Sequence, residues 1–174
     1  MKFAGLSRLV LCAGLLLSTM GCPSAEDSRI QGFREKLQLS DPPGETTSVS
    51  KVRKILLEDS EVGEVADVVI RGRIDAGESP PWEPGKAVFV ITDATGHEGE
   101  EDHDPHTCPF CSRNIKDYLA RVTLVDESGK VIPVDTRELL NVHEKQLVIV
   151  KGKATLSDTE ILLIESSAVY VPQR

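Results

Sequence analysis

Apolar and polar residues alternate in several short segments between residues 66 and 171, which is the pattern of β-strands with one buried face. The segments are rich in β-branched residues and are bounded by Gly, Pro, Asp and Ser, which favour turns. We therefore predict strands there, in chain order at Asp67–Ile74, Ala87–Thr92, Ala120–Val125, Lys130–Val134, Gln146–Lys153 and Glu160–Val171. Because Pro133 has no N–H, the fourth of these strands is expected at a sheet edge or a bulge.

Helices are predicted in four other segments, where the spacing or the composition favours them. They are Arg29–Leu39, Lys51–Leu57, Ser112–Leu119 and Thr136–Lys145. The last helix is expected to start at Asp135, whose carboxylate can cap it, with Glu138 three residues later in the position of a capping box. His143 is expected to be a partly buried residue of this helix rather than a metal ligand.

The order of the elements predicts a mainly β domain over residues 65–174, a small barrel with one helix before its last two strands. Three segments resemble the OB-fold in its nucleic-acid-binding, tRNA-anti-like form: Val69–Ile74 as first strand, Val88–Gly96 as second and Val148–Lys153 as fourth. The resemblance implies a five-stranded barrel, here interrupted by an insertion at residues 96–119. It also implies an oligonucleotide-binding face. That face lacks the expected basic and aromatic residues, so we expect this chain to share the fold of the family but not its nucleic-acid binding.

Residues 1–21 have the pattern of a cleaved export signal. Lys2 and Arg8 precede a short apolar run, and small residues lead to Cys22. This ending resembles a bacterial lipoprotein signal, which implies that Cys22 becomes the lipid-modified first residue. An ordinary secretory signal with an incidental Cys22 is the alternative, and either one predicts an exported chain that faces the periplasm or the exterior. Residues 22–64 are then expected to be a tether with short helices; the segment at Lys51–Leu57 can instead pack on the domain.

The charge of the chain restricts its partners. The net charge is −8, and loss of two basic residues with the signal changes it to −10. An acidic surface repels phosphate backbones, and no basic stripe with interleaved aromatic residues occurs in the sequence. We therefore expect a membrane partner through the lipid and no nucleic-acid partner, while a protein partner is not specified.

The candidate chemistry lies in the insertion, where histidines and cysteines gather within fifteen residues, His97 to Cys111. Imidazole and thiolate are ligands that Zn²⁺ and copper select, and two cysteines separated by two residues can meet one ion. We predict a tetrahedral site made by His103, His106, Cys108 and Cys111, with His97 in reserve. Zinc is the expected metal and copper the alternative. Nearby carboxylates, namely Asp93, Asp102 and Asp104, can orient an imidazole from outside the ligand set.

Two other interpretations of the cysteines stay open. In an oxidising compartment Cys108 and Cys111 can form a structural disulfide, which would leave an OB-type interaction module. The sequence Cys108-Pro-Phe-Cys111 also resembles the active-site motif of glutaredoxins, which implies that Cys108 is the nucleophile and Cys111 the resolving thiol of a thiol-disulfide oxidoreductase. The leading prediction is a non-enzymatic, exported metal-binding module.

Other chemistry has little support in the sequence. Phosphate-binding glycine loops, Ser/His/Asp sets and paired-carboxylate signatures do not stand out, so hydrolase and kinase functions are not indicated. Trp82, the single tryptophan, lies in a Pro-rich loop between the first two strands. It is expected to pack over the mouth of the barrel, with a ligand groove as the alternative.

Overall fold

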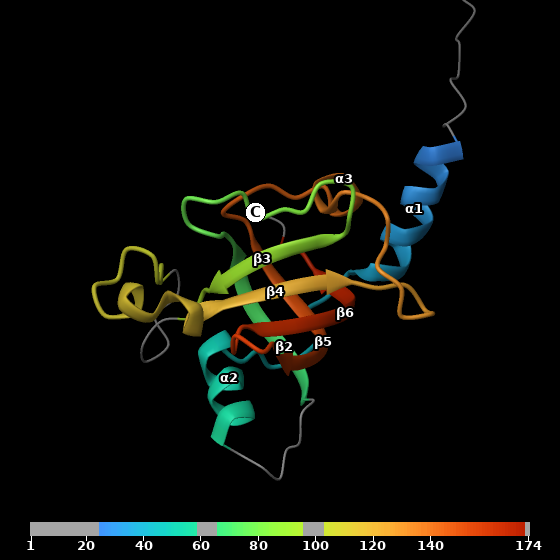
Figure 1. Ribbon diagram of the computed structural model, residues 1–174. Helices are drawn as coiled ribbons and strands as arrows, with labels where there is room; N and C mark the ends of the chain where they lie inside the picture. The colour runs from blue at the N-terminus through green and yellow to red at the C-terminus, as the bar shows by residue number, and fades with distance from the viewer. Residues whose placement is uncertain (1–24, 59–65, 96–102, 173–174) are drawn as a thin grey trace, which may run out of the picture.

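The computed structural model describes residues 25–58, 66–95 and 103–172, and five of its strands close into a barrel (Figure 1). These strands are β2 (Ala66–Ile74), β3 (Val88–Asp93), β4 (Leu119–Leu124), β5 (Leu147–Leu156) and β6 (Leu162–Tyr170). The order around the barrel is β2, β3, β4, β6 and β5, and β5 pairs with β2 to close it. All neighbours are antiparallel except β4 and β6. This closed five-stranded architecture confirms the predicted OB-like barrel.

The core fills the barrel because inward-facing residues alternate along its strands. In β4, Ala120, Val122 and Leu124 are buried, whereas Arg121 between them is exposed. Phe89 of β3 is the largest fully buried side chain, and such an aromatic residue removes roughly 150 to 250 Å² of surface from water. Burial of this apolar interior is the main stabilising contribution to the barrel.

Two N-terminal helices cover the barrel from outside. Helix α1 (Ala25–Leu37) leads into the two-residue strand β1 (Gln38–Leu39), which adds parallel to β6, and α2 (Val49–Glu58) contacts β2, β3, β4 and β5. Apolar residues of both helices join the core, namely Ile30, Leu37, Val49 and Val52. The two helices therefore pack the described part of residues 22–64 on the barrel.

Among the described helices, none is long and apolar enough to cross a membrane.

Helix α3 (Thr136–Leu140) precedes the last two barrel strands, as predicted, but it is shorter than predicted. Its start agrees with the sequence, because Asp135 accepts a hydrogen bond from the N–H of Arg137 (3.0 Å). It ends at Asn141, which has the left-handed conformation (φ 54°) that stops a helix. The predicted extension to Lys145 is wrong for this reason, and His143 is exposed beyond the helix instead of partly buried within it.

The predicted strand at Lys130–Val134 is also wrong. In the structure this segment makes one isolated bridge, between Val125 and Val131. Pro133 cannot donate to a ladder, and the segment bends after it toward α3. Its apolar residues nevertheless contribute to the core, since Ile132 and Val134 are buried there.

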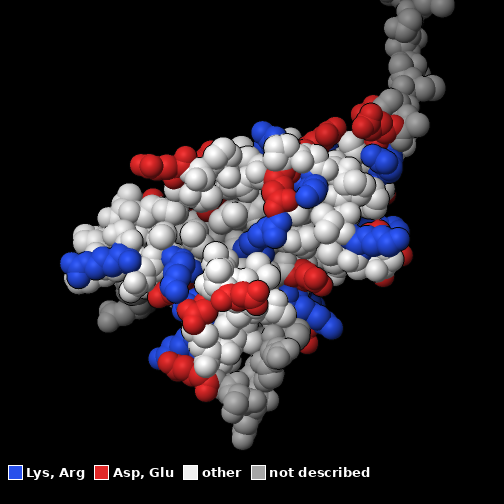
Figure 2. Space-filling model, viewed as in Figure 1, with Lys and Arg blue, Asp and Glu red and all other residues white. Residues whose placement is uncertain are grey.

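Trp82 packs on the barrel. Its ring lies 6.4 Å from that of Phe89 between centroids, and the guanidinium of Arg137 lies 5.8 Å from the indole centroid. A guanidinium over an indole face is attracted by the negative face of the ring. Figure 2 shows that Lys and Arg are interspersed with Asp and Glu on the face in view.

Candidate metal centre

The candidate ligands lie in the segment that connects β3 to β4, at the side of the barrel next to α2 (yellow in Figure 1). Asp104 accepts the hydrogen bonds that close a tight turn in this segment. Its main-chain oxygen accepts hydrogen bonds from the N–H groups of Thr107 (3.2 Å) and Cys108 (3.1 Å), and its Oδ1 accepts the N–H of His106 (2.9 Å). The carbonyl of Cys108 then accepts the N–H of Ser112 (3.0 Å). Two successive turns therefore bring residues from 103 to 111 close together in space.

Three of the predicted ligands converge. The donor atoms of His103, Cys108 and Cys111 all lie within 4.8 Å of one another, and His103 Nε2 is 3.3 Å from Cys111 Sγ. Zinc ligands lie about 2.0 to 2.3 Å from the ion, which places neighbouring donors of a tetrahedral site roughly 3 to 4 Å apart. The distance between His103 and Cys111 falls in this range, and the three side chains lie close enough together that they could hold one ion.

Burial differs among the three ligands. Cys111 is fully buried at the start of the 3₁₀ helix η2 (Cys111–Tyr118), whereas His103 and Cys108 are partly exposed. Both cysteines are thiols in the structure. The group is thus anchored in the protein on the Cys111 side and reached by solvent on the side of the other two ligands, which gives an ion a path of entry.

Burial raises the pKa of the Cys111 thiol, and the neighbouring Cys108 and the buried carboxylate Asp93 raise it further, while a hydrogen bond with Tyr118 acts in the opposite direction. That same hydrogen bond raises the pKa of Tyr118 to about 12. A buried thiolate needs a compensating positive charge. A coordinated cation would supply that charge and so favour loss of the thiol proton. The raised pKa therefore favours a neutral Cys111 thiol in the absence of a cation, and a bound cation would have to stabilise the thiolate.

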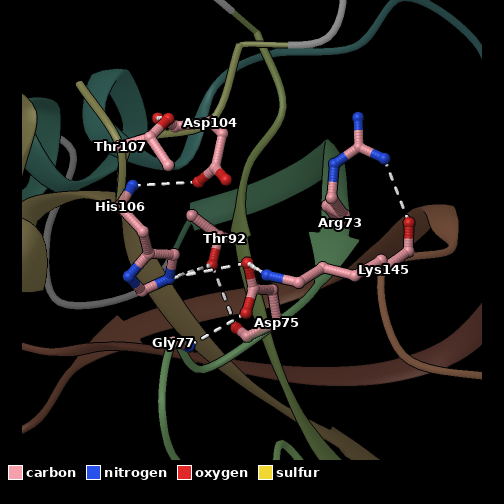
Figure 3. Close-up of polar contacts among 8 residues, drawn as sticks. All are labelled: Arg73, Asp75, Gly77, Thr92, Asp104, His106, Thr107 and Lys145. Atoms are coloured by element: carbon pink, nitrogen blue, oxygen red, sulfur yellow. Dashed lines mark hydrogen bonds and ion pairs between the residues drawn. The ribbon is translucent and has the colours of Figure 1, made fainter.

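His106, another predicted ligand, is not part of this group. Its Nε2 lies 3.1 Å from Thr92 Oγ1 and 3.7 Å from Asp75 Oδ2, on the wall of the barrel (Figure 3). His97 and Asp102 lie outside the described residues, as does Cys22, so their predicted roles stay predictions.

The carboxylates predicted to orient an imidazole have other contacts. Asp93 is buried and accepts hydrogen bonds from the main chain and side chain of both Ser50 and Thr95. Asp104 holds the turn before Cys108 through its main-chain oxygen and its carboxylate. Both residues shape the surroundings of the candidate ligands, one from the barrel and one from the loop.

Arg53 of α2 fixes η2 to the barrel, a contact that sequence reasoning missed. It is 8% exposed, and its guanidinium forms ion pairs with Asp117 of η2 (3.1 Å) and with Glu160 in the turn between β5 and β6 (3.0 Å). Its Nε also donates to the main-chain oxygen of Glu160 (2.8 Å). These partners are 64 and 107 residues away, respectively, in the chain, so no local pattern reveals them.

The glutaredoxin-like interpretation has mixed support in the geometry. The partly exposed Cys108 and the buried Cys111 match the accessible and resolving thiols of such a motif. However, η2 begins at Cys111 and not at Cys108, so the first thiol does not lie at the start of this helix.

No protein-family model matches the chain, and no curated protein matches it in sequence.

Proposed function

We propose that the protein is an exported, lipid-anchored barrel module that binds one transition-metal ion without catalysing a reaction. The observation that carries the proposal is the convergence of the donor atoms of His103, Cys108 and Cys111 within 4.8 Å of one another. One imidazole and two thiolates favour Zn²⁺, and Cu(I) is the alternative because it also takes soft sulfur ligands. The barrel serves as the rigid support for the ligands.

Metal analysis tests this proposal directly. Protein that starts at residue 22, purified without an affinity tag and kept reduced, is expected to bind one equivalent of Zn²⁺ and to lose it to a strong chelator. Binding should raise the melting temperature, because an ion that binds the folded chain stabilises it. As a control, His143→Gln removes an exposed histidine outside the group and should leave the stoichiometry at one. A reduced, folded chain that retains no stoichiometric metal would overturn the proposal.

Export and lipid attachment rest on the sequence of residues 1–22. We predict that the full chain, expressed in a bacterium, incorporates a radiolabelled fatty acid and sediments with membranes. Cys22→Ser should abolish the label, since the thiol is the point of attachment, whereas Cys12→Ser, a control within the predicted signal, should not. Equal labelling of the wild type and Cys22→Ser would contradict lipid attachment at this residue.

A thiol-disulfide oxidoreductase is the second candidate, because the sulfurs of Cys108 and Cys111 lie within 4.8 Å and only the first is accessible. In that reaction the Cys108 thiolate attacks a substrate disulfide and releases one substrate thiol. Cys111 then displaces the other and leaves a Cys108–Cys111 disulfide, which a thiol reductant reduces to regenerate the dithiol. Insulin reduction with dithiothreitol measures the activity. Turnover that is unchanged in Cys108→Ser would exclude this function.

A further inference from the structure

The imidazole of His106 points toward Thr92 and Asp75 of the barrel (Figure 3), and it is not among the donors that converge with the two cysteines. Thr92 has one hydroxyl hydrogen, and its Oγ1 donates it to the main-chain oxygen of Asp75 (2.9 Å). The contact of 3.1 Å between Thr92 Oγ1 and His106 Nε2 therefore requires that Nε2 carries a hydrogen and donates it. The ring is thus bound to the barrel by a hydrogen bond of defined direction.

The barrel wall at this point is built to receive the ring. The Asp75 carboxylate, whose side chain is 1% exposed, lies 3.7 Å from His106 Nε2. Its Oδ1 accepts the N–H of Gly77 (2.9 Å) and its Oδ2 accepts a hydrogen bond from Lys145 Nζ (2.5 Å), so the carboxylate is fixed on both sides. A buried carboxylate with two such partners is a rigid neighbour for an imidazole N–H.

Gly77 makes room for the other edge of the ring. A Cβ at this position would lie 2.9 Å from His106 Cε1 and 3.0 Å from its Nδ1, and the backbone of Gly77 has a φ of +69°. Any larger residue would therefore displace the imidazole. Glycine in the loop after β2 is required both by the backbone conformation and by the position of His106.

The same histidine belongs to the turn that positions a metal ligand. The N–H of His106 donates to Asp104 Oδ1 (2.9 Å), and the main-chain oxygen of Asp104 accepts the N–H of Cys108 (3.1 Å). His106 lies between His103 and Cys108 in the chain, so a ring fixed on the barrel fixes the loop at a point between two ligands. Loops that carry ligands need such anchors, because a free loop must be ordered when the ion binds.

We propose that His106 is a positioning residue of the metal centre and not one of its ligands: its bond to Thr92, with Asp75 behind it, holds the loop so that His103, Cys108 and Cys111 converge. This inference rests on the proposed metal-binding function. It replaces the His₂Cys₂ ligand set predicted from the sequence with three donors and an anchor.

Glutamine separates the two roles of His106. The side-chain NH₂ of glutamine can replace Nε2–H as a donor to Thr92, but a neutral amide is a poor ligand for Zn²⁺ or Co²⁺. We expect His106→Ala to weaken Co²⁺ and Zn²⁺ binding about 10- to 100-fold, the range typical of residues that support a ligand, and His106→Gln to stay within a few-fold of the wild type. The absorption bands of bound Co²⁺ should be unchanged in His106→Gln, because the ligands are the same.

Thr92 provides a matched pair of variants at the other end of the bond. Thr92→Val keeps the shape but removes the hydroxyl, and it should weaken metal binding as His106→Ala does, whereas Thr92→Ser should restore it. Urea unfolding of each variant identifies any that no longer folds. If His106→Gln loses binding and changes the cobalt spectrum while Thr92→Val binds normally, His106 is a ligand and the proposal is overturned. Normal binding by His106→Ala would overturn it as well.

A readout without metal distinguishes this proposal from the proposed function. The equilibrium between the Cys108–Cys111 disulfide and glutathione measures how well the loop holds the two sulfurs together. His106→Ala should shift this equilibrium toward the dithiol severalfold, and His106→Gln should not. A wild type that binds no metal but shows this difference would refute the metal function and support the anchor. A wild type that binds metal, with identical equilibria in all variants, would refute the anchor alone.

Discussion

Cys111→Ser is expected to lower the affinity for Zn²⁺ by more than about 100-fold, since even residues that only support a ligand are worth roughly 10- to 100-fold. Cys111 is the fully buried member of the group, and its sulfur is 3.3 Å from His103 Nε2. A serine hydroxyl is a hard, weakly acidic donor and cannot replace the thiolate. Competition with a chromophoric zinc chelator measures the change.

Two controls keep this result specific to the site. Ser112→Ala alters the next residue, which is exposed, and should bind Zn²⁺ as the wild type does. Cys108→Ser should weaken binding by a similar factor to Cys111→Ser, because both sulfurs belong to one group. Zinc affinity that is unaffected in both cysteine variants would show that any bound ion lies elsewhere in the chain.

Asp93→Ala is expected to lower the free energy of unfolding by about 2 to 4 kcal/mol, since hydrogen bonds to a charged group are worth roughly 1.5 to 3 kcal/mol each and are not additive. The Asp93 carboxylate is 1% exposed and accepts hydrogen bonds from Ser50 N–H (3.2 Å) and Ser50 Oγ (3.0 Å) in α2. It also accepts from Thr95 N–H (3.0 Å) and Thr95 Oγ1 (2.5 Å). Urea denaturation followed by circular dichroism measures the loss.

Asp126→Ala provides the matched control for Asp93. Asp126 also accepts three hydrogen bonds within a turn, from Ser128 N–H, Ser128 Oγ and Lys130 N–H, but it is partly exposed, unlike the buried Asp93. Water can replace these bonds, so Asp126→Ala should destabilise the protein less. Asp93→Asn keeps the shape and one acceptor oxygen, and an intermediate loss is expected. If Asp93→Ala costs no more than Asp126→Ala, the carboxylate does not tie α2 to the barrel.

The barrel could be predicted because each of its strands is marked by a pattern within a short stretch of sequence. Alternation of apolar and polar residues has a period of two in any half-buried strand, and it located all five barrel strands. The errors arose where a neighbouring residue overrides the pattern. Asn141 stops α3 through its left-handed backbone, and Pro133 keeps the apolar residues around it out of a ladder although they are buried.

The candidate site could be predicted only in part, for the same reason. His103, Cys108 and Cys111 are within nine residues, so two turns suffice to gather them. The orientation of His106 depends on Thr92 and on Asp75, which lies 31 residues earlier in the chain and reaches the ring through the fold of the barrel. Spacing alone cannot distinguish a histidine that faces the sulfurs from one that faces a strand.

The contacts of Arg53 join η2, which follows the candidate ligands, to a part of the chain that is synthesised later. Its partner Glu160 lies in the turn that precedes the last strand, and β4, which follows η2, pairs in parallel with that strand. On the ribosome the cysteines therefore emerge well before the surface that η2 rests on exists. If the chain crosses a membrane unfolded, the support of the candidate centre by this surface is completed only after translocation. The ion it holds would then be set by the metal supply at the destination and not by that of the cytosol.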